Sequence, residues 1–292
     1  MPRGVPKAGF RMTKNRKRNG GKSAKTPAVL SAPVYREPEV PETEDQIRNK
    51  LDERFAAMSM MVADAIKGDV RAVVISGPAG VGKSHEVHAT LDKAQPFHTI
   101  IHGFVRPTGL YKTLYEYRHP GSVVVFDDAD SIFNDDISLN ILKTACDTTR
   151  KRVISWLAET NMTDTDGASK LPTQFEFEGT VIFITNQDFD YLIDKGSKLA
   201  PHFAALVSRS MYIDMKMTSK MDYIVRIKQV IEKGMLRNMG LSAQDEAEIM
   251  EFVIKFQDTI RELSLRMIVK LATLKKSRPT KWQALAKVVC VR

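Results

Sequence analysis

Short runs of aliphatic and β-branched residues, separated by helical patterns, mark most of the chain. Each run is too short for a buried helix and ends at turn residues or charges, so each predicts a buried strand. Strands that alternate with helices are typical of a mainly parallel sheet with helices on both faces. The five predicted strands lie at 72–76, 97–101, 122–127, 180–185 and 211–215.

A long amphipathic helix is predicted before the first strand. Thr43 and Gln46 have the spacing of a capping box at its start, and Gly68 is placed to end it. One face of this helix is apolar, because hydrophobic side chains recur every three or four residues. These side chains are Ile47, Leu51, Phe55, Met58, Val62 and Ile66.

The pattern changes toward the C-terminus, where the strands stop and three amphipathic helices are predicted. Ser242 is expected to cap the second of these helices and Ser264 the third. The chain is therefore expected to consist of a basic tail (1–42), an α/β core (43–216) and a small all-helical domain (217–292). The apolar positions are Met221, Ile224, Ile227, Ile231 and Met235 in the first helix, Ile249, Phe252, Val253, Phe256 and Ile260 in the second, and Ile268, Leu271 and Leu274 in the third.

Basic residues are concentrated at the N-terminus. The chain of 292 residues has a formal charge of +9, and residues 1–27 hold nine of its 44 lysines and arginines and no acid. The rest of the chain carries 35 basic and 35 acidic side chains, so the predicted folded body has no net charge. Residues 1–40 have no apolar period and are expected to be disordered. Two interpretations of the tail stand: an arm that binds DNA or RNA phosphates through charge, or a solvated segment that aids solubility.

No segment predicts a membrane protein. No run approaches the ~18 apolar residues that a bilayer span requires, and the basic N-terminus lacks the apolar stretch of a secretory signal. The two cysteines, Cys146 and Cys290, have no metal-binding or redox spacing and are compatible with a reducing compartment. We therefore expect a cytoplasmic protein with no membrane partner.

A phosphate-binding motif follows the first predicted strand. The segment GPAGVGKS fits G-x-x-x-x-G-K-[ST], with a strand before it and a helix after it. Its glycines let the backbone curl so that N–H groups point at phosphate oxygens, and the helix N-terminus adds a positive dipole end. Lys83 is expected to reach the β- and γ-phosphates, and the Ser84 hydroxyl to bind Mg²⁺. A glycine-rich turn without a ligand is the alternative. The expected cofactor-binding residues are Gly77, Pro78, Ala79, Gly80, Val81, Gly82, Lys83 and Ser84, with Asp127.

The predicted strand at 122–127 ends in acidic residues. Asp127 stands at the carboxyl edge of the sheet, where ligands bind in open α/β folds, and a carboxylate there can hold Mg²⁺ together with Ser84. Asp128 follows and is expected to orient or deprotonate the attacking water. A guanine-specific site is disfavoured, because TNQDF has Phe189 where an N-K-x-D motif needs Asp. The sequence therefore predicts a site for ATP and Mg²⁺.

Five segments of the chain resemble the AAA+ ATPases, in that family's order: GPAGVGKS, VVVFDDAD, VIFITN, LVSRS and LSLR. The resemblance covers about residues 46–275. The last three segments, together with a helical lid, distinguish AAA+ proteins from other P-loop proteins. The resemblance implies an α/β fold, namely a P-loop NTPase three-layer αβα sandwich with a mainly parallel five-stranded sheet, plus a small all-α lid domain.

The resemblance also implies catalytic roles for residues outside the P-loop. Asn186 matches sensor 1, which helps to position water, and Arg209 matches the arginine finger, which reaches the γ-phosphate of a neighbouring subunit in this family. Arg266 matches sensor 2, and a cation in the first turn of a helix suggests an anion nearby. A plain turn residue and two surface arginines are the alternatives. At Asp128 the family usually has Glu, so slow turnover or switch-like use of ATP is compatible with the sequence. The expected catalytic residues are therefore Asp128, Asn186, Arg209 and Arg266.

Two further regions are candidates for contact with a polymer. Segments 152–157 and 174–179 are strand-like and predict either an inserted hairpin or an ordinary loop. Phe104, Arg106 and Tyr111 follow the second strand, where AAA+ proteins carry pore loops. For Tyr111, a place in the core of the next helix is favoured.

The sequence as a whole predicts an ATP hydrolase that uses Mg²⁺. From the resemblance we expect a homo-oligomer, a ring such as a hexamer, which couples hydrolysis to remodelling or loading on nucleic acid or nucleoprotein. Two alternatives stand. One is a protein remodeller or chaperone, which the charge-neutral body fits. The other is a small-molecule kinase with a helical lid, in which Arg209 and Arg266 both act in cis.

Overall fold

The computed structural model describes residues 42–157, 162, 163, 167 and 169–292. The predictions for the basic tail at 1–27 fall outside the described residues. Within the described part of the chain, no helix combines the length and the apolar character needed to cross a membrane.

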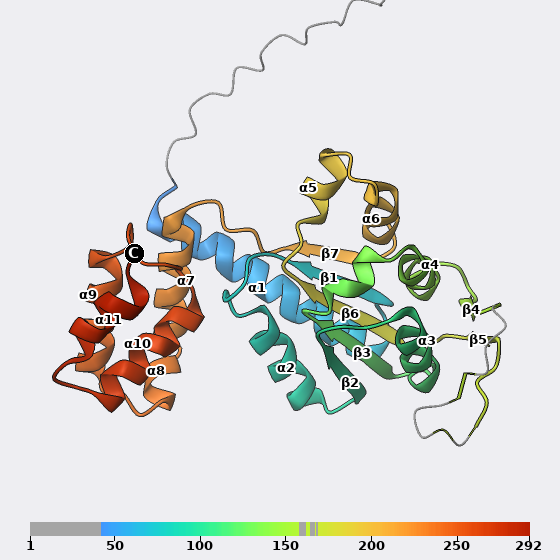
Figure 1. Ribbon diagram of the computed structural model, residues 1–292, viewed down its shortest axis with the longest axis horizontal. Helices are drawn as coiled ribbons and strands as arrows, with labels where there is room; N and C mark the ends of the chain where they lie inside the picture. Colours follow the sequence, from blue (N-terminus) through green and yellow to red (C-terminus); the bar gives the residue numbers. More distant parts are fainter. Residues whose placement is uncertain (1–41, 158–161, 164–166, 168) are drawn as a thin grey trace, which may run out of the picture. The chain divides into compact units, whose positions relative to one another are not determined.

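A five-stranded parallel sheet forms the centre of the α/β part (Figure 1). The strand order is β2-β3-β6-β1-β7, and every neighbouring pair runs parallel. All five predicted strands are confirmed, as is the expectation of a mainly parallel sheet. The bounds are β1 Ala72–Ser76, β2 Phe97–His102, β3 Ser122–Asp127, β6 Thr180–Thr185 and β7 Met211–Asp214.

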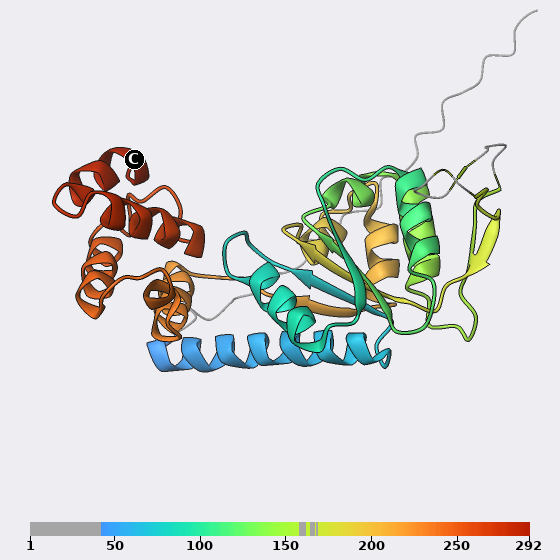
Figure 2. The same ribbon diagram turned by 90° about the horizontal axis from the view of Figure 1, so that it is seen from below.

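Helices cover both faces of this sheet and give three layers (Figures 1 and 2). Successive strand residues point to opposite faces. Val73 and Ile75 of β1 therefore pack with α1 and α2, whereas Val74 packs with the helices of the other face. The first face is covered by α1 (Glu44–Lys67) and α2 (Lys83–Ala94), and the second by α3 (Pro107–Glu116), η1 (Asp130–Asn134), α4 (Asp136–Ala145), α5 (Phe189–Asp194) and α6 (Ala200–Val207).

The carboxyl ends of the three central strands lie at one edge of the sheet. Ser76 ends β1 beside Thr185, which ends β6, and Asp127 ends β3 beside Ile184. The glycine-rich segment and the acidic segment begin at these strand ends. The parallel register therefore brings together residues that are far apart in the sequence.

Helix α1 has the ends that the sequence predicts. Thr43 and Gln46 form the capping box, and Gly68 ends the helix in the left-handed conformation, with φ of 87°. Near its start, Ile47 and Leu51 pack against an apolar residue of α7 (Lys220–Glu232), Val225. Two ion pairs flank this apolar contact: Arg48–Glu232 at 2.8 Å and Lys228–Glu44 at 2.7 Å.

The C-terminal helices form a hydrophobic core of their own, and here the sequence prediction needs correction. The apolar period predicts a first helix that runs through Met235, but Gly234, with φ of 93°, ends that segment and starts a separate short helix. Ile260 lies beyond the second helix, whose C-cap is Phe256. Helix α11, which begins at Trp282, was not predicted. The helices after α7 are α8 (Met235–Asn238), α9 (Ala243–Lys255), α10 (Leu265–Ser277) and α11 (Trp282–Cys290).

An antiparallel hairpin is inserted between α4 and β6. Strand β4 (Val153–Ser155) pairs with β5 (Gln174–Glu176), and Ile154 and Phe175 face each other in the core. The Arg152 guanidinium stabilises the base of the hairpin, because it donates hydrogen bonds to the carbonyls of residues 145 and 179. The hairpin interpretation is therefore confirmed, and the ordinary loop is wrong.

Candidate nucleotide-binding site

The glycine-rich segment forms a loop that runs from the end of β1 into α2. Helix α2 begins at Lys83, and its N-cap, Gly82, has a φ of 103° and makes no side-chain capping bond. The N–H groups of the first turn are thus not used by a capping side chain and are available to an anion. Gly77 is also required sterically, because a Cβ there would lie 2.8 Å from the Cβ of Met215.

Lys83 lies at the centre of this loop. Its Nζ donates hydrogen bonds to the carbonyl oxygens of Gly77 (2.7 Å) and Pro78 (2.9 Å) and to Oδ1 of Asn186 (3.0 Å). Burial lowers the pKa of Lys83 to about 8, although the carboxylates of Asp128 and Asp127 act in the opposite direction. A phosphate group would stabilise the charged ammonium, which burial otherwise disfavours.

Asp127 and Ser84 form an oxygen-rich pair beside the start of α2. The Ser84 hydroxyl donates a 2.9 Å hydrogen bond to Oδ1 of Asp127, whose side chain is buried. Hydroxyl and carboxylate oxygens suit Mg²⁺, which accepts one or two protein ligands and completes its shell with water and phosphate oxygens. These two residues therefore fit the ion that the sequence predicts.

Asn186 connects the loop lysine to the second acid. While its Oδ1 accepts from Lys83, its Nδ2 donates a 2.8 Å hydrogen bond to Oδ1 of Asp128. Asp128 has a φ of 53°, which is unusual for a residue with a side chain, and its N–H donates to the carbonyl of Ile184. The parallel register and this backbone turn place the Asp128 carboxylate, rather than the next acid, against Asn186.

Asp130 faces another partner. Its Oδ1 accepts a 2.6 Å hydrogen bond from the Thr185 hydroxyl, and burial raises the pKa of Asp130. Asp130 is therefore held at the strand end, whereas the carboxylate of Asp128 is about half exposed and lines a cavity over the glycine-rich loop.

The C-terminal helices close one side of a cavity of about 580 Å³ over the glycine-rich loop. The N–H of Leu265 donates a 2.8 Å hydrogen bond to the carbonyl of Gly80, so the start of α10 contacts the loop directly. Ser264 caps α10 as predicted, and Arg266 in its first turn lies with Nη2 3.9 Å from Oδ2 of Asp128. The cavity is lined by loop residues, by Asp128, Asn186 and Arg266, and by apolar side chains that include Val230, Met235, Met239 and Val269.

Among the cavity residues that the sequence analysis missed, Arg226 on α7 contacts the glycine-rich loop. Its Nε donates to the carbonyl of Val81 (3.1 Å), and its guanidinium lies 3.4 Å above the ring centroid of Phe55. Burial lowers the pKa of Arg226 to about 10, and its Nη1 is buried without a hydrogen-bond partner. The sequence carries one signal that could have identified Arg226. Tyr223, Arg226 and Val230 are three and four positions apart, so they share a second face of the helix.

Arg209 is not brought together with the other predicted residues. It follows α6, donates to the carbonyl of Ala205, and pairs with Asp147 at 3.5 Å. It is absent from the residues that line the cavity, and its side chain is 35% exposed.

The candidate pore residues have different surroundings. Tyr111 is fully buried, and its hydroxyl donates to the carbonyl of Pro172, so its place in the core is confirmed and a role in gripping a polymer is wrong. Arg106 is the N-cap residue of α3, and Phe104 is 77% exposed. Of the three, Phe104 keeps the exposure that a polymer contact requires.

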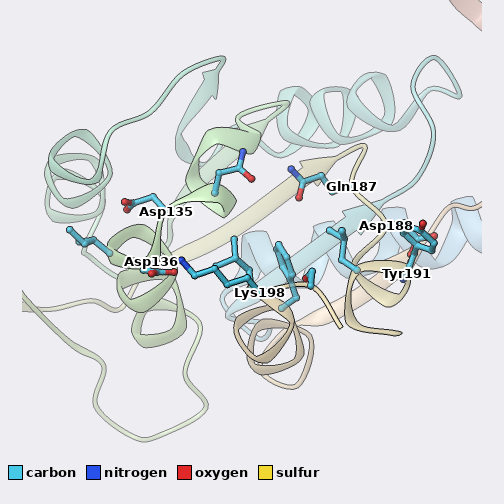
Figure 3. A pocket seen from close by; sticks show the side chains of 12 residues that line it. Asp135, Asp136, Gln187, Asp188, Tyr191 and Lys198 are labelled. Carbon is cyan, nitrogen blue, oxygen red and sulfur yellow. The ribbon is translucent and has the colours of Figure 1, made fainter. Parts of the chain in front are cut away.

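A larger hollow of about 840 Å³ lies near the start of α4 and α5 (Figure 3). Its labelled acids include Asp135 and Asp188. Both are already used as N-caps, because they accept from the N–H groups of residues 138 and 191. This hollow is larger, but the glycine-rich loop, Lys83 and Asp127 are not among its lining residues, so we place nucleotide chemistry in the cavity over the loop.

Comparison with known proteins places the chain in a family. No family model matches it. It is 34% identical over 253 residues to an uncharacterized 36.7 kDa protein from the nrdC–mobD intergenic region of Enterobacteria phage T4, a match that covers 85% of this chain and 77% of the phage protein. The chain belongs to the family of this T4 protein.

The fold of this chain is similar to that of RuvB. The structure of a point mutant of RuvB from Thermotoga maritima superimposes with a TM-score of 0.50 at 14% identity, over 85% of this chain and 73% of RuvB. The structure of NtrX from Brucella abortus in complex with ATP has a TM-score of 0.48 at 13% identity, over 83% of this chain and 54% of NtrX. The likeness to RuvB confirms the α/β fold with C-terminal helices that the resemblance implied.

Proposed function

We propose that this protein binds ATP together with Mg²⁺ and hydrolyses it. The observation that carries the proposal is the network at the edge of the sheet, in which Asn186 joins Lys83 to Asp128 and Ser84 joins Asp127. Lys83 and the N–H groups of α2 bind the phosphates, and Ser84 and Asp127 hold the metal. The ion supplies Lewis-acid stabilisation of the phosphate oxygens when it is bound.

The second acid, Asp128, and the two predicted sensor residues, Asn186 and Arg266, complete the proposed site. Asp128 accepts the proton of the attacking water or orients it, and Asn186 fixes the position of that carboxylate. Arg266 approaches the terminal phosphate from α10, and residues 217–292 act as a lid over the nucleotide. The direct contacts of Leu265 and Arg226 with the loop support this role for the C-terminal helices.

Hydrolysis is proposed to occur between copies of the chain in a ring. Arg209 lies outside the cavity of its own chain, which favours action on a neighbouring subunit and disfavours the kinase in which Arg209 and Arg266 both act in cis. An ATPase rate per chain that rises with protein concentration would support this assembly.

The task coupled to hydrolysis is proposed to be remodelling or loading on nucleic acid. The concentration of positive charge in residues 1–27 supports it. RuvB of Thermotoga maritima is a Holliday junction branch migration motor, which adds a nucleic-acid precedent for the fold. The second candidate, remodelling of a polypeptide, is favoured by the absence of net charge in residues 28–292.

An ATPase assay with the purified chain tests the proposal. We expect phosphate release that requires Mg²⁺ and stops with EDTA, and we expect Lys83→Ala to abolish nucleotide binding because the phosphates lose their main side-chain counter-ion. Unchanged ATP affinity in Lys83→Ala would overturn the phosphate-site assignment. Stimulation by single- or double-stranded DNA or by RNA separates the nucleic-acid task from the polypeptide task.

A further inference from the structure

Two histidines lie beside the buried carboxylate of Asp127. His88 Nε2 is 3.4 Å from Oδ2 of Asp127, and His102 Nδ1 is 3.7 Å from the same oxygen. One ligand atom from each of the three residues lies within 4.8 Å of the others. The Nε2 atom of His88 is buried and has no hydrogen-bond partner. A buried nitrogen without a partner beside a carboxylate needs an explanation.

The fold brings these three residues together from three elements. His102 ends β2 directly beside Asp127, which ends β3 in the same register. His88 lies one helical turn after Ser84 on α2, so the two side chains share a face of that helix. The site is thus built on the ends of two strands and on a helix rather than on loops.

We propose that His88, His102 and Asp127 bind a divalent transition-metal ion of the zinc type. Imidazole nitrogens with one carboxylate suit Zn²⁺ and its transition-metal neighbours, whereas Mg²⁺ prefers oxygen ligands. Bonds of about 2.0–2.1 Å in a tetrahedral site separate ligand atoms by about 3.4 Å. The observed separations of 3.4 and 3.7 Å from Asp127 are close to this spacing. Nδ1 of His102 lies 3.2 Å from the carbonyl oxygen of Asp127, a contact that binding of the ion would replace, and the side chain is 60% exposed, so the ring has room to turn toward the ion.

The two oxygens of Asp127 face different partners. Oδ1 accepts from Ser84, and Oδ2 faces the two histidines. The proposed ion would therefore take a position distinct from that of the Mg²⁺ in the proposed function, with one oxygen of Asp127 facing each position. The competing explanation is that the histidines only orient Asp127 through hydrogen bonds, and it predicts no binding of metal.

Metal binding by the untagged, nucleotide-free chain tests the proposal. The probes are Zn²⁺ in isothermal titration calorimetry and Co²⁺ in visible absorption spectroscopy. We expect one Zn²⁺ per chain, and Co²⁺ bands in the visible range that report nitrogen and oxygen ligands. His88→Gln and His102→Gln should each weaken binding by at least about tenfold, because losing a ligand costs no less than losing a residue that supports one. Zinc should also raise the melting temperature of the parent more than that of the double variant.

His119→Gln is the matched control, because His119 is exposed and precedes the start of β3, whereas Asp127 lies at the opposite end of that strand. It should bind Zn²⁺ like the parent. Circular dichroism checks that each variant is folded, and His102→Gln keeps the test decisive if His88→Gln does not fold, because His102 is the more exposed. A parent chain that binds neither ion, or a His102→Gln variant that binds Zn²⁺ as tightly as the parent, would overturn the proposal. Neither outcome depends on ATP hydrolysis.

Discussion

The ammonium of Lys83 is held by backbone carbonyls before any phosphate arrives, and its pKa of about 8 makes the site sensitive to pH. Above pH 8 the lysine of the free protein loses its proton, while bound phosphates favour the charged form. ATP affinity should therefore be constant below pH 8 and fall by up to ~tenfold per pH unit above it. Titration calorimetry between pH 7 and 10 measures this.

Lys83→Arg is the control for this prediction. A guanidinium stays charged over the whole range, so its weaker ATP binding should not fall further above pH 8. A flat affinity profile in the parent would contradict the lowered pKa. For folding, the same lowered pKa means that burying the charge costs stability at neutral pH, and that this cost is relieved as the pH rises above 8 toward 10.5, the ordinary value.

The second residue-scale prediction concerns Asp128. Asn tolerates the left-handed backbone and can still accept from Asn186, so Asp128→Asn removes the charge and little else. We expect the variant to bind ATP like the parent and to hydrolyse it about 10²–10⁴-fold more slowly. Asp127→Asn should instead weaken the Mg²⁺-dependent part of binding. Hydrolysis by Asp128→Asn at the parent rate would transfer the catalytic role to Asp130.

At the scale of the elements, the contact between the glycine-rich loop and α10 leaves no room for a side chain at Gly80. A Cβ on Gly80 would lie 2.7 Å from the Cβ of Ser264, so Gly80→Ala must push α10 away from the loop. We expect a loss of unfolding free energy and of ATP affinity. Gly68→Ala is the matched control, because its φ is also positive but its surroundings are open, so it should cost only ~1–2 kcal/mol and leave ATP affinity unchanged. Denaturant unfolding and ATP titration on both variants decide the point. Equal effects of the two substitutions on ATP affinity would contradict the loop–α10 contact.

The central strands β1, β3 and β6 were predictable from the sequence because they are buried on both faces and appear as nearly continuous apolar runs. The edge strands β2 and β7 are only partly buried, and their apolar runs are interrupted by polar residues. The C-terminal helices were less predictable from the sequence. Gly234 divides one apolar period between two helices, and the spacing of Ile260 continues the helical period past the end of α9. Helix α11 went unpredicted although Trp282, Ala286 and Cys290 recur every four residues and are buried.

The residues of the candidate site also differ in how far the sequence predicts them. The loop and Asp127 form local motifs whose chemistry depends on adjacent residues, so the sequence is sufficient to predict them. Arg226 and His88 have no motif, because their importance comes from contacts with segments distant in sequence. The roles of the loop residues, of Asp127 and Asp128, and of Asn186, Arg209 and Arg266 all stay predictions, although Asn186 and Arg266 line the cavity over the loop.

At the scale of the whole molecule, Arg209 provides the test of a shared active site. If it acts on a neighbouring subunit, Arg209→Ala should bind ATP normally and hydrolyse it more slowly, by a factor on the order of 10³. Mixing it with Lys83→Ala, which keeps Arg209, should restore part of the activity, because a mixed interface pairs an intact phosphate site with an intact arginine.

Arg278→Ala is the control for this mixing experiment, since Arg278 is exposed and lies at the end of α10. It should hydrolyse ATP like the parent. Mixtures that never exceed the sum of their separate activities, or a chain that stays monomeric with ATP at every protein concentration, would contradict the shared site and favour the kinase.

The tail provides a second whole-molecule test. Deletion of residues 1–27 removes nine positive charges and none of the residues in the cavity, so basal ATPase activity should be unchanged. If the tail binds phosphates, nucleic-acid affinity should fall and its dependence on salt should flatten. Fluorescence anisotropy across a salt series measures both. Identical binding curves for the two forms would leave solubility as the role of the tail.

The contact between α1 and α7 has a mechanical consequence. The ion pairs Arg48–Glu232 and Lys228–Glu44 are at the surface, so each contributes at most about 1 kcal/mol and is screened by salt. A third ion pair, Lys50–Asp222 at 3.8 Å, involves a buried carboxylate and is screened less. The apolar residues between them are insensitive to screening. The stiffness of the contact between α1 and α7 therefore depends on ionic strength. Added salt weakens the ion pairs at its periphery, while the apolar centre keeps the two helices attached.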